Sequence, residues 1–315
     1  MTDEPPAPPS RTGGPPASWP HRALYDRVVA TLYALPDRFT SPLYIEGVPA
    51  TDLFTMNSAL GAAIEQSVVE SLNDLRALWD PDKTYAEYSF VRQTQQFPDV
   101  VLRSDNPALK GSEILMGIEL KGWFVLSKEG EPSFRYKINP DCCAPADLLV
   151  VLPWSFSSVV SGRPTLLEPI VSEARFAAEQ RNYHWTWLRG NPKAQPQSKR
   201  GVKPAADKGF YPTKASQTSD SAISDTGGNF GRVARCGVMD EDVDARLEEP
   251  LLGIPTDAWR RFLVIFADGA NEESIRAGIS TLQRSFETAE LSAAQRERSA
   301  EILEEIAGML RAGSD

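Results

Sequence analysis

The spacing of hydrophobic positions changes along the chain and predicts where helices and strands form. Between residues 56 and 79, apolar residues recur every three or four positions, which is typical of a helix buried on one face, and Thr55 or Asn57 is placed to cap it. Short apolar runs predict strands at 100–102, 118–123, 133–138, 146–152 and 166–171. Helical spacing returns at 173–187, 256–266, 271–288 and 291–311.

Two of the expected strands carry a further signal. The run at 146–152 is almost continuously apolar, as expected for a strand that is covered on both faces of a sheet. The run at 166–171 contains Pro169, which lacks the N–H needed by a central strand, so we expect an edge strand there. The pattern as a whole predicts an α/β fold.

Polar residues interrupt the apolar pattern at one place where they predict chemistry. Side chains alternate along a strand, so Glu119 and Lys121 point to one face and Leu120 to the other. Asp99 begins the preceding apolar run, and a hairpin between the two strands brings Asp99 close to Glu119. Two adjacent carboxylates repel each other unless a cation lies between them, and Mg²⁺ prefers oxygen ligands. We therefore expect a magnesium-dependent site.

The position of Asp99 distinguishes it from other aspartates that follow proline. Four Pro-Asp pairs occur in the chain, but only Pro98-Asp99 begins an apolar run and precedes the Glu-x-Lys strand at hairpin distance. In the competing interpretation, Asp99 is a turn residue, and Glu119 and Lys121 form a solvated pair on an edge strand.

With these motifs, the chain resembles the PD-(D/E)xK nuclease superfamily, and in particular its type II restriction endonuclease-like members. The family core runs helix, strand with Asp, strand with Glu-x-Lys, strand, helix, and residues 56–235 follow that order, with 173–187 as the closing helix. The resemblance implies an α/β fold with a restriction-endonuclease-like core, a mixed central β-sheet flanked by helices, to which a C-terminal helical region is added. It also implies that Asp99 and Glu119 bind Mg²⁺, that Lys121 helps to position or polarise the attacking water, and that Glu65 on the first helix faces the metal. An exposed helix glutamate is the alternative for Glu65.

Charge is distributed unevenly along the chain. The net charge is −10, but residues 189–235 contain nine Lys and Arg residues against three Asp, so this segment carries about +6 and the remainder about −16. The segment is also dense in Gly, Pro, Ser and Thr, which predicts a long loop. Such a basic loop attracts the phosphates of double-stranded DNA.

Particular side chains of the basic loop are candidates for contact with DNA. Aromatic and Arg residues interleave with its glycines, and Asn and Arg have the geometry to read base edges. The candidate DNA-binding residues are Lys208, Lys214, Asn229, Arg232 and Arg235. The alternative is an ordinary flexible linker between the core and the C-terminal helices.

Composition divides the chain into four parts. Residues 1–20 are rich in Pro, Ser and Gly and predict a disordered, dispensable tail, followed by a nuclease core at 21–188, the basic loop at 189–235 and an acidic helical region at 236–315. An apolar stripe on the last helix indicates either dimerisation or packing against the chain's own core. No apolar run approaches the length of a membrane helix or signal peptide, so we expect a cytoplasmic protein without a membrane partner.

The scarcity of certain residues excludes several other chemistries. The two histidines, His21 and His184, are too few for a His-rich zinc site or an HNH-type nuclease motif. The three cysteines form neither a CxxC zinc pattern nor a disulfide framework, and no GxxxxGK[ST] loop is present for ATP hydrolysis.

The sequence thus favours a type II restriction-like endonuclease that cleaves double-stranded DNA at a specific sequence. We expect a homodimer, because two-fold symmetry matches a palindromic site, and a cognate DNA methyltransferase as the biological partner. Two alternatives stay open, namely a repair or recombination nuclease that recognises DNA structure and a non-catalytic DNA-binding protein on a nuclease fold.

Overall fold

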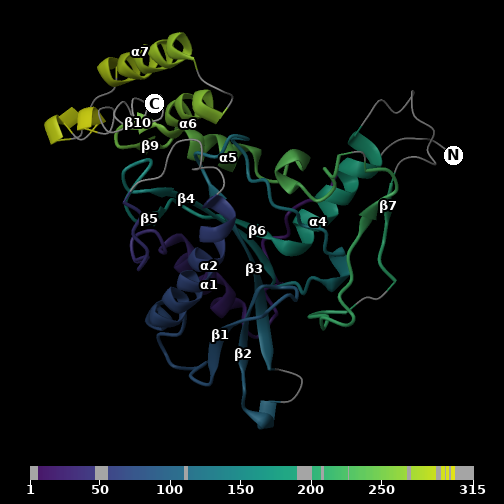
Figure 1. Cartoon of the computed structure of the whole chain (residues 1–315). Helices are drawn as coiled ribbons and strands as arrows, with labels where there is room; N and C mark the ends of the chain where they lie inside the picture. The colour runs from purple at the N-terminus through teal and green to yellow at the C-terminus, as the bar shows by residue number, and fades with distance from the viewer. Residues whose placement is uncertain are drawn as a thin grey trace.

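The protein is an α/β structure in which a curled mixed sheet is flanked by helices (Figure 1). The computed structural model describes residues 6–46, 56–109, 113–189, 201–206, 209–225, 227–267, 271–288, 292–294, 296–297 and 299–301. The predicted fold class is confirmed at this level.

The sheet consists of six strands in the order β1-β2-β3-β4-β5, with β6 also paired to β4. All neighbouring pairs are antiparallel except β3 and β4, which run parallel, so the sheet is mixed as expected. The strands are β1 (Tyr88–Arg92), β2 (Val100–Ser104), β3 (Ile114–Phe124), β4 (Leu148–Phe156), β5 (Pro164–Leu166) and β6 (Ile170–Glu173). Every residue of β4 is buried, which agrees with its continuous apolar run.

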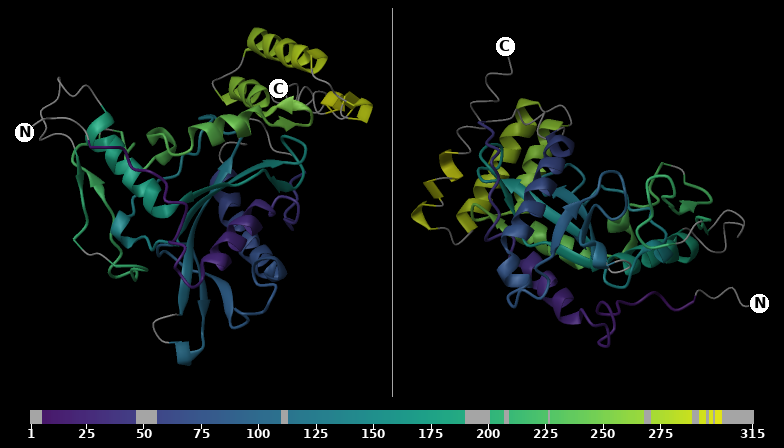
Figure 2. Two further views of the ribbon diagram at one scale, coloured as in Figure 1. Left: turned by 180° about the vertical axis from the view of Figure 1, so that it is seen from behind. Right: turned by 90° about the horizontal axis from the view of Figure 1, so that it is seen from below.

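Helices cover the sheet from opposite sides. Figures 1 and 2 show α1 and α2 on one side and α4 on the other. The helices of this part are α1 (Arg22–Tyr33), α2 (Met56–Asp74), α3 (Arg76–Trp79) and α4 (Ala174–Tyr183), and a π-helical turn at His184–Leu188 continues α4. Together they nearly reproduce the helices expected at 56–79 and 173–187.

Two strand predictions differ from the structure. Residues 133–138 do not form a strand, although Tyr136 and Ile138 are buried. Their backbone lies beside irregular segments, for example through the Tyr136 N–H bond to the Gly231 carbonyl, so no regular ladder forms. The edge strand expected at 166–171 is divided around Pro169 into the ends of β5 and β6, both of which pair with β4.

The C-terminal region is helical, as expected. It comprises α5 (Asp240–Glu248), the short hairpin of β9 (Pro250–Leu251) and β10 (Ile254–Pro255), α6 (Thr256–Ala267) and α7 (Glu272–Thr288). The helices expected at 256–266 and 271–288 are therefore confirmed, whereas most of 291–311 lies outside the described residues. Within the described part of the chain, no helix is long and apolar enough to cross a membrane.

The remaining elements are short. The segment expected as a long loop contains a small antiparallel pair, β7 (Val202–Lys203) and β8 (Ser221–Ala222). The 3₁₀ turns among the described residues are η1 (Pro107–Leu109), η2 (Pro140–Cys142) and η5 (Val233–Cys236). Phe230, just before η5, is 1% exposed and packs edge-on against Trp185, with 5.5 Å between the ring centroids. The end of the segment expected as a loop therefore belongs to the core.

The N-terminal segment differs from the disordered tail that its composition predicts. The carboxylate of Glu173 accepts hydrogen bonds from the backbone N–H groups of Thr12 (3.1 Å), Gly13 (2.7 Å) and Gly14 (3.2 Å). Gly13 and Gly14 have φ values of 78° and 91°, which turn successive N–H groups toward one anion. Trp19 then packs against the core. The expectation was wrong for this part because backbone donors, rather than apolar burial, fasten the segment.

The hydrogen bonds from Thr12, Gly13 and Gly14 to Glu173 form a clasp between the N-terminal segment and β6. This clasp predicts a change in protease sensitivity. Burial acts to raise the pKa of Glu173, but the hydrogen bonds from Thr12, Gly13 and Gly14 outweigh it, so the pKa falls below the usual 4.5. The clasp therefore holds at neutral pH and weakens as the pH falls through that lowered pKa. Glu173→Ala should accelerate tryptic cleavage after Arg11 at least about fivefold, the effect of losing about 1 kcal/mol of local stability.

A neighbouring glutamate provides the control. Glu179→Ala removes a partly exposed carboxylate from α4, the helix that follows Glu173, without removing any hydrogen bond of the clasp, and should leave cleavage after Arg11 unchanged. Equal cleavage of wild type and Glu173→Ala would contradict the role of the clasp.

Candidate active site

The candidate site lies at the edge of β3 just beyond the end of its pairing with β2. The register of the two strands ends at Val100 opposite Ile118. Asp99, the residue before Val100, places its Oδ2 3.0 Å from the backbone N–H of Leu120 and accepts its hydrogen bond. The Asp99 carboxylate thus takes the place of the next backbone hydrogen bond between β2 and β3. It is fixed at a part of the β3 edge that β2 does not cover.

Three side chains meet at this edge. Lys121 Nζ lies 3.0 Å from Asp99 Oδ2 and 2.8 Å from Glu119 Oε1, and Glu119 Oε2 accepts the backbone N–H of Asp99 at 3.2 Å. The hairpin and the common face of Glu119 and Lys121 are therefore confirmed. The ammonium lies between two carboxylates that would otherwise repel each other.

Burial strengthens the electrostatic coupling of the cluster. The side chains of Asp99, Glu119 and Lys121 are 29%, 11% and 19% exposed. Burial raises the pKa of Glu119 to about 7, with Lys121 opposing and Asp99 adding to that change. Burial alone would lower the pKa of Lys121, but the charges of Glu119 and Asp99 outweigh it and raise it. Lys121 therefore stays an ammonium at neutral pH, and its Nζ acts as a donor.

Glu65 lies close enough to the cluster to share its electrostatics. Burial raises its pKa, Asp99 raises it further, and the cations Lys121 and Arg92 lower it. Helix α2 approaches β3 closely, because a Cβ on Gly122 would lie 3.6 Å from the Cα of Gly61, one turn before Glu65. The predicted placement of Glu65 near the site thus agrees with the structure.

Arg92 is a member of this environment that the sequence reasoning missed. It lies at the end of β1, and its Nη2 is 3.5 Å from Glu65 Oε2. The β-prone run Tyr-Ser-Phe-Val before it was a usable signal, because a strand there would pair with β2 and carry Arg92 to the same edge.

Asp147 is a second buried carboxylate that the sequence reasoning missed. Its oxygens accept the N–H groups of Gly117 and Ala144, each at 2.7 Å, and the hydroxyl of Tyr211 at 3.0 Å. Burial raises the pKa of Asp147 to about 7, against these hydrogen bonds. A Cβ at Gly117 would lie 2.2 Å from Pro98, so only glycine fits there. Asp147 thus braces β3 two residues before Glu119.

The side chains present suit a cation that keeps most of its water. Among the described residues, no group of three or more His, Cys, Asp and Glu side chains is arranged to hold a metal ion. Mg²⁺ usually retains several waters and binds through one or two carboxylates. Asp99 and Glu119 supply two such carboxylates, and a divalent cation beside them would favour the ionised form of Glu119, which burial disfavours. The donor set therefore fits Mg²⁺.

The candidate DNA-binding residues gather elsewhere. Arg232 Nη1 lies 3.1 Å from Glu129, Arg235 pairs with Glu131, and Arg235 also donates to Asn229 Oδ1 at 2.9 Å. The structure thus brings three candidates together, but beside acidic residues of the loop that follows β3. Lys214 is exposed, and Lys208 lies outside the described residues. Their contact with DNA stays a prediction that requires these ion pairs to open.

Comparison with known proteins returns no match to this chain. No family model matches it, and neither the curated proteins nor the solved structures contain a match. Its fold and site together define an α/β protein with an Asp, Glu and Lys cluster at an open strand edge.

Proposed function

We propose that this protein is a Mg²⁺-dependent endonuclease that cleaves double-stranded DNA at a specific sequence, as type II restriction enzymes do. The observation that carries the proposal is the convergence of Asp99, Glu119 and Lys121 within hydrogen-bond distance at the open edge of β3. An adventitious surface pair would be exposed, whereas these side chains are mostly buried, and their charges are mutually dependent.

Each residue has a distinct part in the proposed reaction. When bound, Mg²⁺ lowers the pKa of water and stabilises negative charge on the phosphate. Asp99 and Glu119 hold the cation through their carboxylate oxygens. Lys121 Nζ stays protonated and donates a hydrogen bond, which positions the attacking water or stabilises charge on the phosphate oxygens. Glu65, held by Arg92, is the possible third acidic participant.

The arrangement of elements supports the resemblance to the PD-(D/E)xK superfamily. Helix α2, strands β2, β3 and β4 and helix α4 follow one another in the family's order, with Asp99 directly before β2 and Glu119 on β3. On this basis we propose a restriction-endonuclease-like core, a homodimer on a palindromic site and a cognate methyltransferase as partner. We also propose the cytoplasm as its location.

The proposed metal site predicts that cation binding weakens in acid. A proton and a metal ion compete for Glu119, whose pKa is raised to about 7, so Mn²⁺ affinity should fall as the pH decreases from about 8 to about 6. Calorimetric titration of the DNA-free protein measures this directly. An ordinary carboxylate pair would keep its affinity over this range, because both groups would stay ionised.

Two variants define the control for that titration. Asp99→Asn should weaken Mn²⁺ binding at least about tenfold, because a charged ligand becomes a neutral one. Asp105→Asn changes an aspartate at the other end of β2 that is 86% exposed, and it should bind Mn²⁺ like wild type. Equal affinity of wild type and Asp99→Asn would exclude Asp99 as a ligand.

A structure-specific DNA nuclease is the second candidate function, and one observation favours it. A cavity lined by aromatic side chains opens at the start of β3, the strand that carries Glu119 and Lys121, and aromatic faces bind unpaired bases. Cleavage of forks or junctions but not of plain duplex would identify this activity. Retention of DNA without cleavage of any of these substrates would instead indicate a non-catalytic binding protein.

A further inference from the structure

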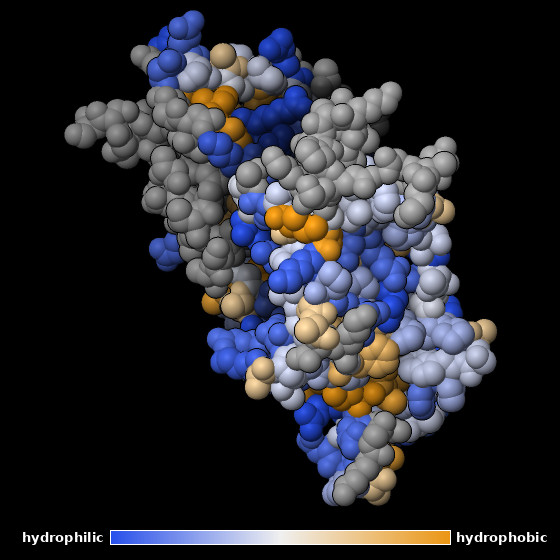
Figure 3. Space-filling model, turned by 90° about the vertical axis from the view of Figure 1, so that its right-hand side faces the viewer, coloured by the Kyte–Doolittle hydropathy of each residue, from blue (hydrophilic) through white to orange (hydrophobic). Residues whose placement is uncertain are grey.

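A cavity of about 780 Å³ opens between the N-terminal segment, the start of β3 and the segment that contains Tyr211. Its volume lies in the range of sites that hold small organic groups. Figure 3 shows hydrophobic residues gathered near the lower end of the molecule, the end at which the tip of the β2–β3 hairpin lies in Figure 1. The cavity is lined both by aromatic side chains and by charged ones.

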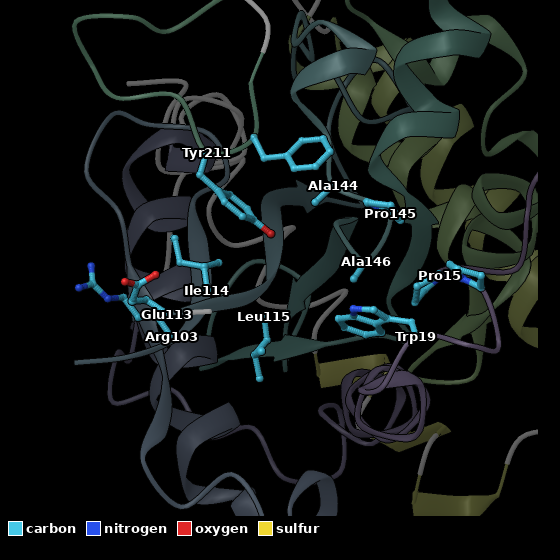
Figure 4. Close-up of a pocket in the computed structure, with 12 residues that line it drawn as sticks. Pro15, Trp19, Arg103, Glu113, Ile114, Leu115, Ala144, Pro145, Ala146 and Tyr211 are labelled. Carbon is cyan, nitrogen blue, oxygen red and sulfur yellow. The ribbon is translucent and has the colours of Figure 1, made fainter. Parts of the chain in front are cut away.

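Flat side chains and charged groups occupy different sides of this cavity. Figure 4 shows Trp19 and Tyr211 across the cavity from each other, with Arg103 and Glu113 together on a third side. Phe210 also lines the cavity and is 52% exposed, so its side chain is accessible from solvent. Aromatic faces with a nearby cation and carboxylate match a nucleobase, whose faces stack and whose edge both donates and accepts hydrogen bonds.

The cavity lies on the strand that carries the candidate active site. Leu115, which lines it, precedes Glu119 by four residues, so the two Cα atoms are roughly 14 Å apart at about 3.4 Å per residue. That separation equals roughly four base steps of DNA at 3.4 Å each.

Tyr211 is held in a strained conformation at the wall of this cavity. Its φ is 54°, in the left-handed region that a bulky residue rarely adopts. Its hydroxyl donates to Asp147, the same carboxylate that accepts the Gly117 N–H on β3. Burial and this hydrogen bond raise the pKa of Tyr211, so the hydroxyl stays a donor. Such strain persists where surrounding contacts fix it, often at ligand sites.

We infer that this cavity receives one unpaired nucleobase of the DNA substrate a few nucleotides from the phosphate that is cut. The inference rests on the proposed nuclease function and adds that the enzyme engages a base outside the helical stack. The base stacks against the aromatic side chains, and Arg103 and Glu113 contact its polar edge. Asp147 links the wall of the cavity to the strand that carries Glu119 and Lys121.

Equilibrium binding without divalent metal tests the inference independently of cleavage. The probe is a fluorescently labelled duplex with a short single-stranded tail, compared by anisotropy with the same duplex lacking the tail. Wild type should bind the tailed duplex more tightly. Phe210→Ala should weaken binding of the tailed duplex by about 5- to 150-fold, the range for losing one aromatic stack, with little effect on the blunt duplex.

The chain offers a matched control for this variant. Ile223 is 53% exposed in the same segment and does not line the cavity, so Ile223→Ala should keep the wild-type preference. Equal binding of both duplexes by wild type, or an unchanged preference in Phe210→Ala with its melting temperature preserved, would overturn the inference. Loss of the preference in Phe210→Ala together with no Mg²⁺-dependent cleavage by wild type would support the base site and overturn the nuclease function.

Discussion

Lys121→Ala is expected to lower the rate of DNA cleavage by about 100- to 1000-fold while leaving the fold and DNA binding intact. Removing one preorganised charge-stabilising group from an active site typically costs about 2.7–4 kcal/mol of transition-state stabilisation. Lys121 Nζ is within 3.0 Å of Asp99 and 2.8 Å of Glu119, and it is the group placed to stabilise charge there. Single-turnover cleavage with saturating enzyme measures the chemical step separately from binding.

The remaining carboxylates explain why the variant should still fold. Lys121 lowers the pKa of Glu119, so its loss favours a protonated, neutral Glu119 beside Asp99. Lys128→Ala, which removes an exposed lysine just beyond β3, is the matched control and should cleave at the wild-type rate. Undiminished cleavage by Lys121→Ala would remove the residue from the mechanism.

Arg181→Met is expected to destabilise the protein by about 3–5 kcal/mol, because it leaves Asp220 as an unpaired buried charge. Both side chains are 0% exposed, and Arg181 Nη2 lies 2.7 Å from Asp220 Oδ2. Arg181 also donates to the Tyr136 carbonyl at 2.8 Å and lies over the ring of Phe230. Urea unfolding, with the midpoint and slope compared with wild type, gives the free-energy difference.

A second substitution separates loss of the ion pair from loss of packing. Arg181→Met combined with Asp220→Leu replaces the pair with apolar side chains of similar size and should recover most of the lost stability. If the double variant were as unstable as the single one, the buried charge of Asp220 would not be the cause.

The core of the candidate site was predictable because it depends on local sequence. Alternation along one strand set Glu119 and Lys121 on one face, and the short distance to Asp99 favoured a hairpin, which is a local contact. The position of Glu65 near the site was predictable from the resemblance to the PD-(D/E)xK superfamily, in which a glutamate on the first core helix faces the metal. Helices with strong periodicity, such as α6 and α7, were also predicted to within about one residue.

The features that the sequence did not indicate depend on contacts distant along the chain. Residues 133–138 have the alternating pattern of a strand. Their backbone nevertheless forms no strand, because it lies beside the irregular segment around Gly231 and hydrogen-bonds to it. The N-terminal segment reads as disordered by composition, but Glu173 lies about 160 residues away and fastens it through backbone donors. Likewise, Arg232 and Arg235 lie beside Glu129 and Glu131 because of tertiary packing.

Digestion of unmethylated plasmid and phage DNAs by the purified protein with Mg²⁺ tests the central claim most directly. Wild type should produce discrete fragments that disappear when Mg²⁺ is chelated and that are lost in Lys121→Ala beside it. Intact DNA after incubation with folded, DNA-binding wild-type protein would contradict a sequence-specific endonuclease at Asp99, Glu119 and Lys121.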